Sequence, residues 1–312
     1  MAQIRFAQIS DIHISHRGDL HDMLSGRSAG FLARVIDELN RMADLDFVLF
    51  TGDLMVEGAH SELEQFLQAV QTLQKPYYVI PGNHDRREPD DPHGLTRRQF
   101  AERFNPQLDS RPPDEYGQVG YWSQEVKPGV QLIGLDSNLD DDWGGIISPA
   151  QMAWLEAELS THAGRLVILA VHHPLHRLSP IDDLPGWNRF VCQNGSDVLA
   201  LLDRHPQVKL VLHGHHHLTR TDRLNGRVHL ACPALAIFPC AYRLVQVDPQ
   251  TGGTYRIAWQ TCPAADEATT AEARRRMFDR WAAGTDLPLT LIEQMVEQAA
   301  GRAEDRHGQM VV

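Results

Sequence analysis

Five short clusters of aspartate, asparagine and histidine each follow an apolar run that is typical of a β-strand. In chain order they are Asp11-Ile12-His13, Gly52-Asp53, Gly82-Asn83-His84-Asp85, His172-His173-Pro174 and Gly214-His215-His216-His217. In open α/β sheets, the carboxyl ends of the strands line the crevice that binds the ligand. We therefore expect these clusters, although far apart in the sequence, to meet at one edge of the fold.

The residue types in these clusters are those of a metal site without thiolates. Carboxylate and amide oxygens together with imidazole nitrogens suit Mn, Fe, Zn or Co better than a soft metal. Any one cluster has a structural explanation as a turn, a helix cap or a buried histidine. Five of them at five strand ends are difficult to explain in that way. The candidate ligands are also too many for one ion, so we predict two ions that share a bridging carboxylate.

Apolar runs alternate with amphipathic stretches along most of the chain. The predicted strands lie at 4–10, 46–52, 77–82, 131–137, 165–171 and 208–214, and the predicted helices at about 29–42, 60–74, 96–104, 149–161 and 196–205. Strands separated by helices indicate an α/β fold. Beyond residue 225, the runs at 227–233, 242–248 and 253–260 predict consecutive antiparallel strands.

The end of the chain differs in character from the rest. Residues 265–284 and 287–305 have the pattern of two helices, the second of which is expected to fray. Such a tail is either an extension docked on the catalytic part or an oligomerisation element. We therefore predict a catalytic domain at 1–262 and a helical C-terminal extension at 263–312, and we leave open a homo-oligomer assembled through the extension.

Composition narrows the classes of protein and partner. The chain has 312 residues, of which 42% are hydrophobic and 22% charged, as in ordinary globular proteins. Its net charge of −12 argues against a nucleic acid polymer as a partner. No apolar run approaches the roughly 20 residues of a membrane span, and no signal peptide is recognisable. We therefore expect a cytoplasmic protein that has no membrane partner and keeps its four cysteines reduced.

The ordered series Asp-x-His, Gly-Asp, Gly-Asn-His-Asp, His-x-Pro and Gly-His-x-His resembles the signature of the calcineurin-like metallophosphoesterases. The resemblance covers about residues 4–247. The stretches "GLDSNLDD" and "LLDRHPQVKLVLHGHHH" are further similar to the branch that holds class III cyclic nucleotide phosphodiesterases and bacterial glycerophosphodiesterases. The resemblance implies a four-layer αββα sandwich with a dinuclear metal centre, here followed by the helical extension.

The resemblance also assigns individual ligands. The first ion is expected to bind Asp11, His13 and His217, the second Asn83, His172 and His215, and Asp53 is expected to bridge both. In the His-His-Pro cluster, the ligand of the family stands two residues before the proline. In the last cluster we choose the outer two of the three consecutive histidines, because residues two apart on an extended segment point to the same side. The remaining histidines are then turned away or structural: His173, His216 and His213.

The resemblance implies hydrolysis of a small phosphodiester by a hydroxide that bridges the two metals. His84 is expected to stabilise or protonate the leaving alkoxide, oriented by Asp85. We expect activity on small phosphodiesters, namely 3′,5′-cyclic nucleotides or related diesters, and glycerophosphodiesterase or broad phosphatase activity are the alternatives. A nuclease is disfavoured by the acidic composition, and a non-catalytic scaffold by the complete set of ligands. Trp143 and Trp187 are expected either to stack on a base of the substrate or to pack within their loops.

Overall fold

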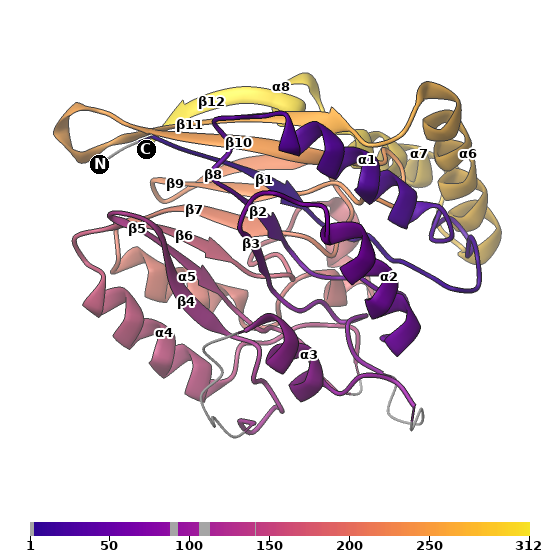
Figure 1. Ribbon diagram of the computed structural model, residues 1–312. Coiled ribbons are helices and arrows are strands. Elements are labelled where there is room, and N and C mark those ends of the chain that lie inside the picture. Colours follow the sequence, from indigo (N-terminus) through magenta and orange to yellow (C-terminus); the bar gives the residue numbers. More distant parts are fainter. Residues whose placement is uncertain (1–2, 88–92, 106–112, 141) are drawn as a thin grey trace.

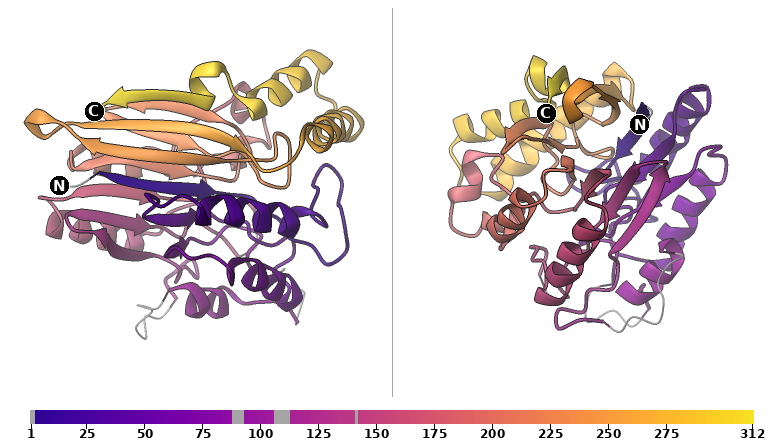
Figure 2. Two further views of the ribbon diagram at one scale, coloured as in Figure 1. Left: turned by 45° about the horizontal axis from the view of Figure 1, so that its top comes forward. Right: turned by 90° about the vertical axis from the view of Figure 1, so that its left-hand side faces the viewer.

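Two β-sheets face each other in the centre of the molecule, and helices cover their outer faces. The computed structural model describes residues 3–87, 93–105, 113–140 and 142–312. The layers run helix, sheet, sheet, helix (Figure 1; Figure 2, right). This arrangement confirms the predicted four-layer sandwich.

Each sheet has six strands. The first has the order β12-β11-β10-β1-β2-β3, and the second has the order β4-β5-β6-β7-β9-β8. The strands of the first sheet are β1 (Ile4–Ile9), β2 (Phe47–Phe50), β3 (Tyr77–Val79), β10 (Ala241–Pro249), β11 (Tyr255–Pro263) and β12 (His307–Val311). Those of the second are β4 (Trp122–Lys127), β5 (Val130–Gly134), β6 (Leu166–Ala170), β7 (Val208–His213), β8 (Arg220–Leu224) and β9 (Arg227–Ala231).

The centre of each sheet is parallel. Strands β1, β2 and β3 pair in parallel in the first sheet, and β5, β6, β7 and β9 do so in the second. Parallel neighbours end at the same edge of a sheet, and they need crossover segments of a dozen or more residues to connect them. Each sheet therefore presents several strand ends, with the loops that follow them, at one edge.

Five helices cover the outer faces. Apolar residues of α1 (Ser28–Asn40), α2 (His60–Val70) and α3 (Arg97–Phe104) pack on the first sheet. Those of α4 (Pro149–Thr161) and α5 (Gly195–Asp203) pack on the second sheet. Because the strands are covered on both faces, they read as nearly continuous apolar runs.

Alternate residues of one strand enter different cores. In β7, Leu210 and Leu212 lie in the core between the sheets, whereas Val211 packs beneath the outer helices. Burying a side chain of this size contributes roughly 1.5–3 kcal/mol. Cores on both faces of a strand fix its position, and therefore also the position of the loop at its end.

The C-terminal helices dock on the same chain. Helices α6 (Glu267–Gly284) and α7 (Leu289–Ala300) lie at the end of the sandwich toward which β1 and β2 point (Figures 1 and 2). Met277 is buried in an apolar cluster with Leu24 and Ile237. Arg27 donates two hydrogen bonds of 2.9 Å to the carboxylate of Glu272. Helices α6 and α7 are therefore docked on the sandwich of the same chain, and a homo-oligomer assembled through them stays a prediction.

The last residues differ from the predicted fraying helix. A short helix, α8 (Ala303–Arg306), leads into β12, which pairs antiparallel with β11. The edge of β11 would otherwise expose unpaired backbone groups, and a further strand satisfies them. The proposed division at residue 262 stays a prediction. None of the described helices is long and apolar enough to cross a membrane.

Candidate metal centre

The backbone is strained at the ends of the strands. Five of the seven predicted ligands adopt left-handed φ angles: Asp11 (52°), His13 (46°), Asp53 (54°), His215 (65°) and His217 (57°). Such a conformation costs of order 1–3 kcal/mol for a residue other than glycine, and it is found mostly at functional sites. The loops therefore hold these side chains in directions that ordinary extended or helical backbone would not give.

Glycines in the motifs allow the loops to approach one another. A Cβ atom on Gly52, whose φ is +94°, would lie 2.5 Å from Nδ1 of His172. A Cβ atom on Gly82 would lie 2.2 Å from Oδ1 of Asp53. Both distances are far below van der Waals contact. The glycines that precede Asp53 and Asn83 are thus required by close packing in the tertiary structure.

The first group of ligand atoms combines three of the strand-end loops. Asp11, His13, Asp53 and His217 each offer one ligand atom, and these atoms lie within 4.8 Å of one another. Nε2 of His217 lies 3.3 Å from Oδ1 of Asp11 and 3.3 Å from Nε2 of His13. Nε2 of His13 lies 3.8 Å from Oδ2 of Asp53. The four ligand atoms are therefore close enough to surround one cation.

The second group shares Asp53 with the first. Ligand atoms of Asp53, His172 and His215 lie within 4.8 Å of one another. Nε2 of His172 lies 3.3 Å from Oδ2 of Asp53 and 3.2 Å from Oδ1 of Asn83. The structure thus brings all seven predicted ligands together, and it places Asp53 between the two groups.

The donor set fits cations at these positions. Nδ1–H of His172 donates to the carbonyl of Thr51 at 2.7 Å, which leaves the lone pair of Nε2 facing the oxygens of Asp53 and Asn83. Three acceptors directed at one point require a proton or a metal ion between them. Among the described residues, Oδ2 of Asp11 and Nδ1 of His13 are also buried without a hydrogen-bond partner. Buried polar atoms normally find a partner, so a bound ion would explain the free oxygen of Asp11.

The surroundings of the centre shift the pKa values of its histidines in opposite directions. Burial disfavours the charged form of His172, but the carboxylates of Asp53 and Asp11 and the hydrogen bond to Thr51 together outweigh burial and raise the pKa of His172 to about 9. Burial also opposes ionisation of Asp53, yet His172 and His84 hold its pKa well below the ordinary value. By contrast, burial lowers the pKa of His13 to about 3. The centre therefore has a strong negative potential around Asp53, which a divalent cation would neutralise.

His84 lies beside the two groups. Its backbone N–H donates to Oδ1 of Asp53 at 2.9 Å, and its ring Nδ1–H donates to the carbonyl of Val56 at 2.7 Å. Its ring lies 5.0 Å from that of His13, edge to face. With Nδ1 occupied, Nε2 is the ring nitrogen that is left to meet a substrate.

The expected role of Asp85 requires a correction. Its Oδ1 accepts hydrogen bonds from the backbone N–H groups of Leu54 and Met55, and its Oδ2 accepts from that of Gly82. Burial and the nearby Asp53 raise its pKa to about 8. The carbonyl of Val56, and not Asp85, orients the imidazole of His84. Asp85 instead ties the Gly-Asp loop to the Gly-Asn-His-Asp loop.

The two histidines that were expected to point away from the ligands make other contacts. Nε2 of His216 lies 2.6 Å from Oδ1 of Asp182, and its ring stacks on Phe190. The ring of His173 is held between the hydroxyl of Ser137 and the carbonyl of Trp143. Both side chains are buried, and these contacts hold the neighbouring loops in place.

A cavity of about 400 Å³ opens over the centre. Its floor includes Asp53, Asn83, His84, His215 and His217, and its walls include His21, Asp22, Trp143, Phe190, Arg280, Trp281 and Thr285. Of the two tryptophans that the sequence suggested, Trp143 lines the cavity. Trp187 packs against Trp281, with ring centroids 5.0 Å apart.

Sequence reasoning missed the contribution of α6. Arg280 and Trp281 bring a cation and an aromatic ring to the outer wall of the cavity. The sequence offered only a weak signal, an arginine beside a tryptophan in a helix that otherwise reads as a solvated extension. No motif marks the pair, because their position depends on how the helix docks.

Comparison with known proteins agrees with this geometry. The family model described as calcineurin-like phosphoesterase matches residues 4–218. A probable glycerophosphodiester phosphodiesterase of Arcobacter nitrofigilis is 31% identical over 222 residues, which are 70% of this chain and 73% of that protein. A 3′,5′-cyclic-nucleotide phosphodiesterase of Nostoc is 31% identical over 221 residues, which are 69% of this chain and 71% of that protein.

Solved structures share the fold at low sequence identity. A dimetal phosphatase from Danio rerio superposes with a TM-score of 0.66 at 14% identity, over 84% of this chain and 97% of its own. A purple acid phosphatase from yellow lupin superposes with a TM-score of 0.58 at 16% identity, over 85% of this chain and 52% of its own. With the family match over most of the catalytic part, these findings confirm the resemblance seen in the sequence. The chain belongs to the calcineurin-like phosphoesterase family.

Proposed function

We propose that this protein is a dinuclear metal-dependent phosphodiesterase that hydrolyses small phosphodiesters. The observation that carries the proposal is the position of Asp53. Its carboxylate belongs to both groups of ligand atoms and also lines the cavity above them. A carboxylate shared in this way is what a pair of ions acting on one phosphoryl group requires.

The chain supplies two sets of groups to this reaction. In our proposal, Asp11, His13 and His217 hold one ion, Asn83, His172 and His215 hold the other, and Asp53 bridges them. Two ions, when bound, would polarise the phosphoryl group and acidify water. His84 faces the cavity with Nε2, where it is placed to donate a hydrogen bond or a proton to the leaving oxygen.

The walls of the cavity favour a substrate that carries a flat ring. Trp143, Phe190 and Trp281 line it, and Arg280 adds a positive charge. Aromatic side chains stack on nucleobases, whereas a glycerol group offers no ring to stack on. A volume of about 400 Å³ lies within the range of sites for small molecules. These features support 3′,5′-cyclic nucleotides as substrates, in line with the relative from Nostoc.

A glycerophosphodiester is the second candidate substrate. The relative from Arcobacter, which is as similar as the one from Nostoc, is named a probable glycerophosphodiester phosphodiesterase. Arg280 can pair with any phosphodiester or acidic leaving group, so it does not distinguish the two. The choice between them depends on whether the aromatic walls contribute to binding.

A substrate panel tests the proposal. Protein reconstituted with Mn²⁺, Zn²⁺, Co²⁺ or Fe²⁺ would be assayed with 3′,5′- and 2′,3′-cyclic nucleotides, glycerophosphodiesters, bis(p-nitrophenyl) phosphate and a simple monoester. We expect kcat/KM to be highest for a 3′,5′-cyclic nucleotide. A higher kcat/KM for glycerophosphodiesters would favour the second candidate, and hydrolysis of the monoester alone would contradict a phosphodiesterase.

Three finer expectations from the sequence stay predictions. The same panel ranks Mn, Fe, Zn and Co by activity, and metal analysis of protein purified from cells would identify the native ions. Sedimentation of the full chain would test a homo-oligomer assembled through residues 263–312. Fractionation of cells would test the expected cytoplasmic location.

A further inference from the structure

A second set of histidines gathers on the outer face of the second sheet. Val211 of β7 pairs in parallel register with His229 of β9. His213 is two residues beyond Val211, so it shares the face on which His229 lies. Asp222 of β8 pairs directly with His229 and lies on the same face. Neighbouring strands therefore place two imidazoles and a carboxylate side by side.

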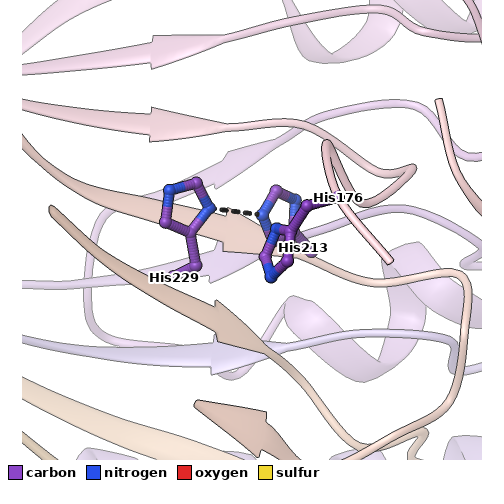
Figure 3. Close-up of side chains that lie close together, drawn as sticks. All are labelled: His176, His213 and His229. Carbon is purple, nitrogen blue, oxygen red and sulfur yellow. Dashed lines mark hydrogen bonds between the residues drawn. The ribbon is translucent and has the colours of Figure 1, made fainter. Parts of the chain in front are cut away.

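His176 completes the group of histidines from a neighbouring loop. It lies in the loop that follows β6, and Figure 3 shows its ring close to those of His213 and His229. One ring nitrogen from each histidine lies within 4.8 Å of those of the other two. Nε2 of His213 and Nδ1 of His229 are 3.2 Å apart. Two imidazole nitrogens on a tetrahedral ion are about 3.3–3.4 Å apart, since each bond is about 2.0–2.1 Å long.

The contacts of His176 are those of a metal ligand. Its Nε2 lies 3.1 Å from Oδ2 of Asp222, and Arg220 fixes that carboxylate with hydrogen bonds of 2.8–3.0 Å. Its Nδ1 is buried and has no hydrogen-bond partner among the described residues. Histidines that bind metals commonly donate the other ring N–H to a carboxylate, which directs the free lone pair at the ion.

We propose that His176, His213 and His229 form a third metal site, which binds one borderline divalent ion such as Zn²⁺. His213 and His229 are almost fully buried, with exposed fractions of 0% and 1%. Three imidazoles without thiolates are a donor set that suits Zn, Cu, Ni or Co better than Mg or Ca. The carboxylate of Asp222 accepts a hydrogen bond from Nε2 of His176 and thereby orients this ligand. Asp222 does not belong to the Asp53 centre.

The site has a structural consequence. The loop that carries His176 follows directly from His172, and His213 is the residue of β7 that leads into His215. An ion bound to the three histidines would tie this loop to β7 and β9. It would therefore stabilise two of the loops that supply ligands to the Asp53 centre, and it would not itself contact the substrate.

The test is metal stoichiometry. The full chain is stripped with a chelator, reloaded with Zn²⁺, desalted and analysed by mass spectrometry of its metal content. We expect His176→Ala to hold about one zinc ion fewer per chain than the wild type. His176 is the preferred position because its side chain is 15% exposed, so its loss disturbs the fold least. Equal zinc content in folded wild type and His176→Ala would overturn the proposal.

His162→Ala is the matched control. His162 follows α4, its side chain is 16% exposed, and it pairs with Glu158, as His176 pairs with Asp222. This variant should hold as much zinc as the wild type. Asp222→Asn keeps all three ligands, and competition with a chelating dye should show about 10–100-fold weaker binding of one ion. Unchanged affinity of Asp222→Asn for zinc would contradict the role of Asp222 in orienting His176.

Anomalous diffraction at the zinc edge tests the site without any substitution. A peak among the three imidazoles in crystals of the wild-type protein soaked with Zn²⁺ would support the proposal. Absence of that peak, with peaks present beside Asp53, would overturn it. Because this readout locates each ion, a failure of the third site is distinguished from a failure of the dinuclear centre.

Discussion

The strand-end loops and helix α6 both contribute to one cavity, but they are built differently. The loops carry ligands on strained, left-handed backbone, packed so closely that Gly52 and Gly82 cannot bear a Cβ atom. Helix α6 is a regular helix that reaches the cavity with Arg280 and Trp281, near its C-terminal end. The loops therefore suit groups that must be held precisely, and the helix suits groups that select a substrate.

This contrast separates the residues that would hold the metals from those that line the outer wall of the cavity. A substitution in a loop alters the position of ligands that several strands hold in common. A substitution at Arg280 or Trp281 alters the outer wall of the cavity and leaves every predicted metal ligand in place, although Trp281 also packs against the apolar cluster that contains Met277. Substitutions in the two regions should thus have different effects on turnover, affinity and metal content.

The largest effect is expected for Asp53→Ala. Removing the carboxylate shared by both groups of ligands should deplete both ions and reduce turnover to background. Metal content and kcat would be measured on the same preparation. Asp53→Asn, which keeps the shape of the side chain and removes its charge, separates loss of charge from misfolding. Two ions retained with near-normal turnover in either variant would break the proposed bridging role.

His84→Ala should reduce kcat by about 10²–10⁴ while both ions are retained. The reason is that His84 meets the substrate and not the ions, since Nδ1 is held by the carbonyl of Val56. A substrate with a good leaving group, such as bis(p-nitrophenyl) phosphate, should lose less activity than a cyclic nucleotide. Full activity of the variant on cyclic nucleotides would exclude this role.

Trp281→Ala tests α6. Loss of aromatic stacking of about 0.5–1.5 kcal/mol should lower kcat/KM for a cyclic nucleotide by roughly 2–13-fold, chiefly through KM. A glycerophosphodiester should be affected much less. Equal losses of kcat/KM for both substrate classes in Trp281→Ala would refute selection by stacking.

Arg280→Gln should weaken binding of every anionic substrate. Its control is Arg276→Gln, one turn earlier on the helix, where the side chain pairs with Asp19 and Glu272.

The smallest effect is expected for Glu272→Gln, which weakens the docking of α6. The hydrogen bonds from Arg27 lower the pKa of Glu272 to about 2, from an ordinary value of 4.5. A lowered carboxyl pKa stabilises the fold above pH 4.5, and the contribution is lost as the pH falls toward 2. Because the pair is partly exposed to solvent, Tm at pH 7 should fall by at most about 2 °C, and the difference should vanish in acid. The comparison variant is Glu293→Gln, on an exposed position of α7.

The sequence was sufficient to predict the parts of the structure that follow general rules of strand and helix patterning. Apolar runs separated by amphipathic stretches predicted the α/β fold, and the polar clusters after those runs predicted where ligands would meet. Residues such as Asp11, Asp53 and His172 could be placed because the strand before each one is a nearly continuous apolar run. The end of the chain was harder, since β12 is exposed on alternate residues and has no apolar run to mark it.

Contacts between distant segments were decided only by the tertiary structure. The orientation of His84 by Val56, the cross-loop hydrogen bonds of Asp85, and the arrival of Trp281 at the cavity all depend on how loops and helices dock. The meeting of His176 with His229 depends on strand register as well. Local sequence determines which segments become strands and which residues follow them. The packing of one segment on another determines what those residues face. Such packing is a property of the whole fold, so no single stretch of sequence determines it.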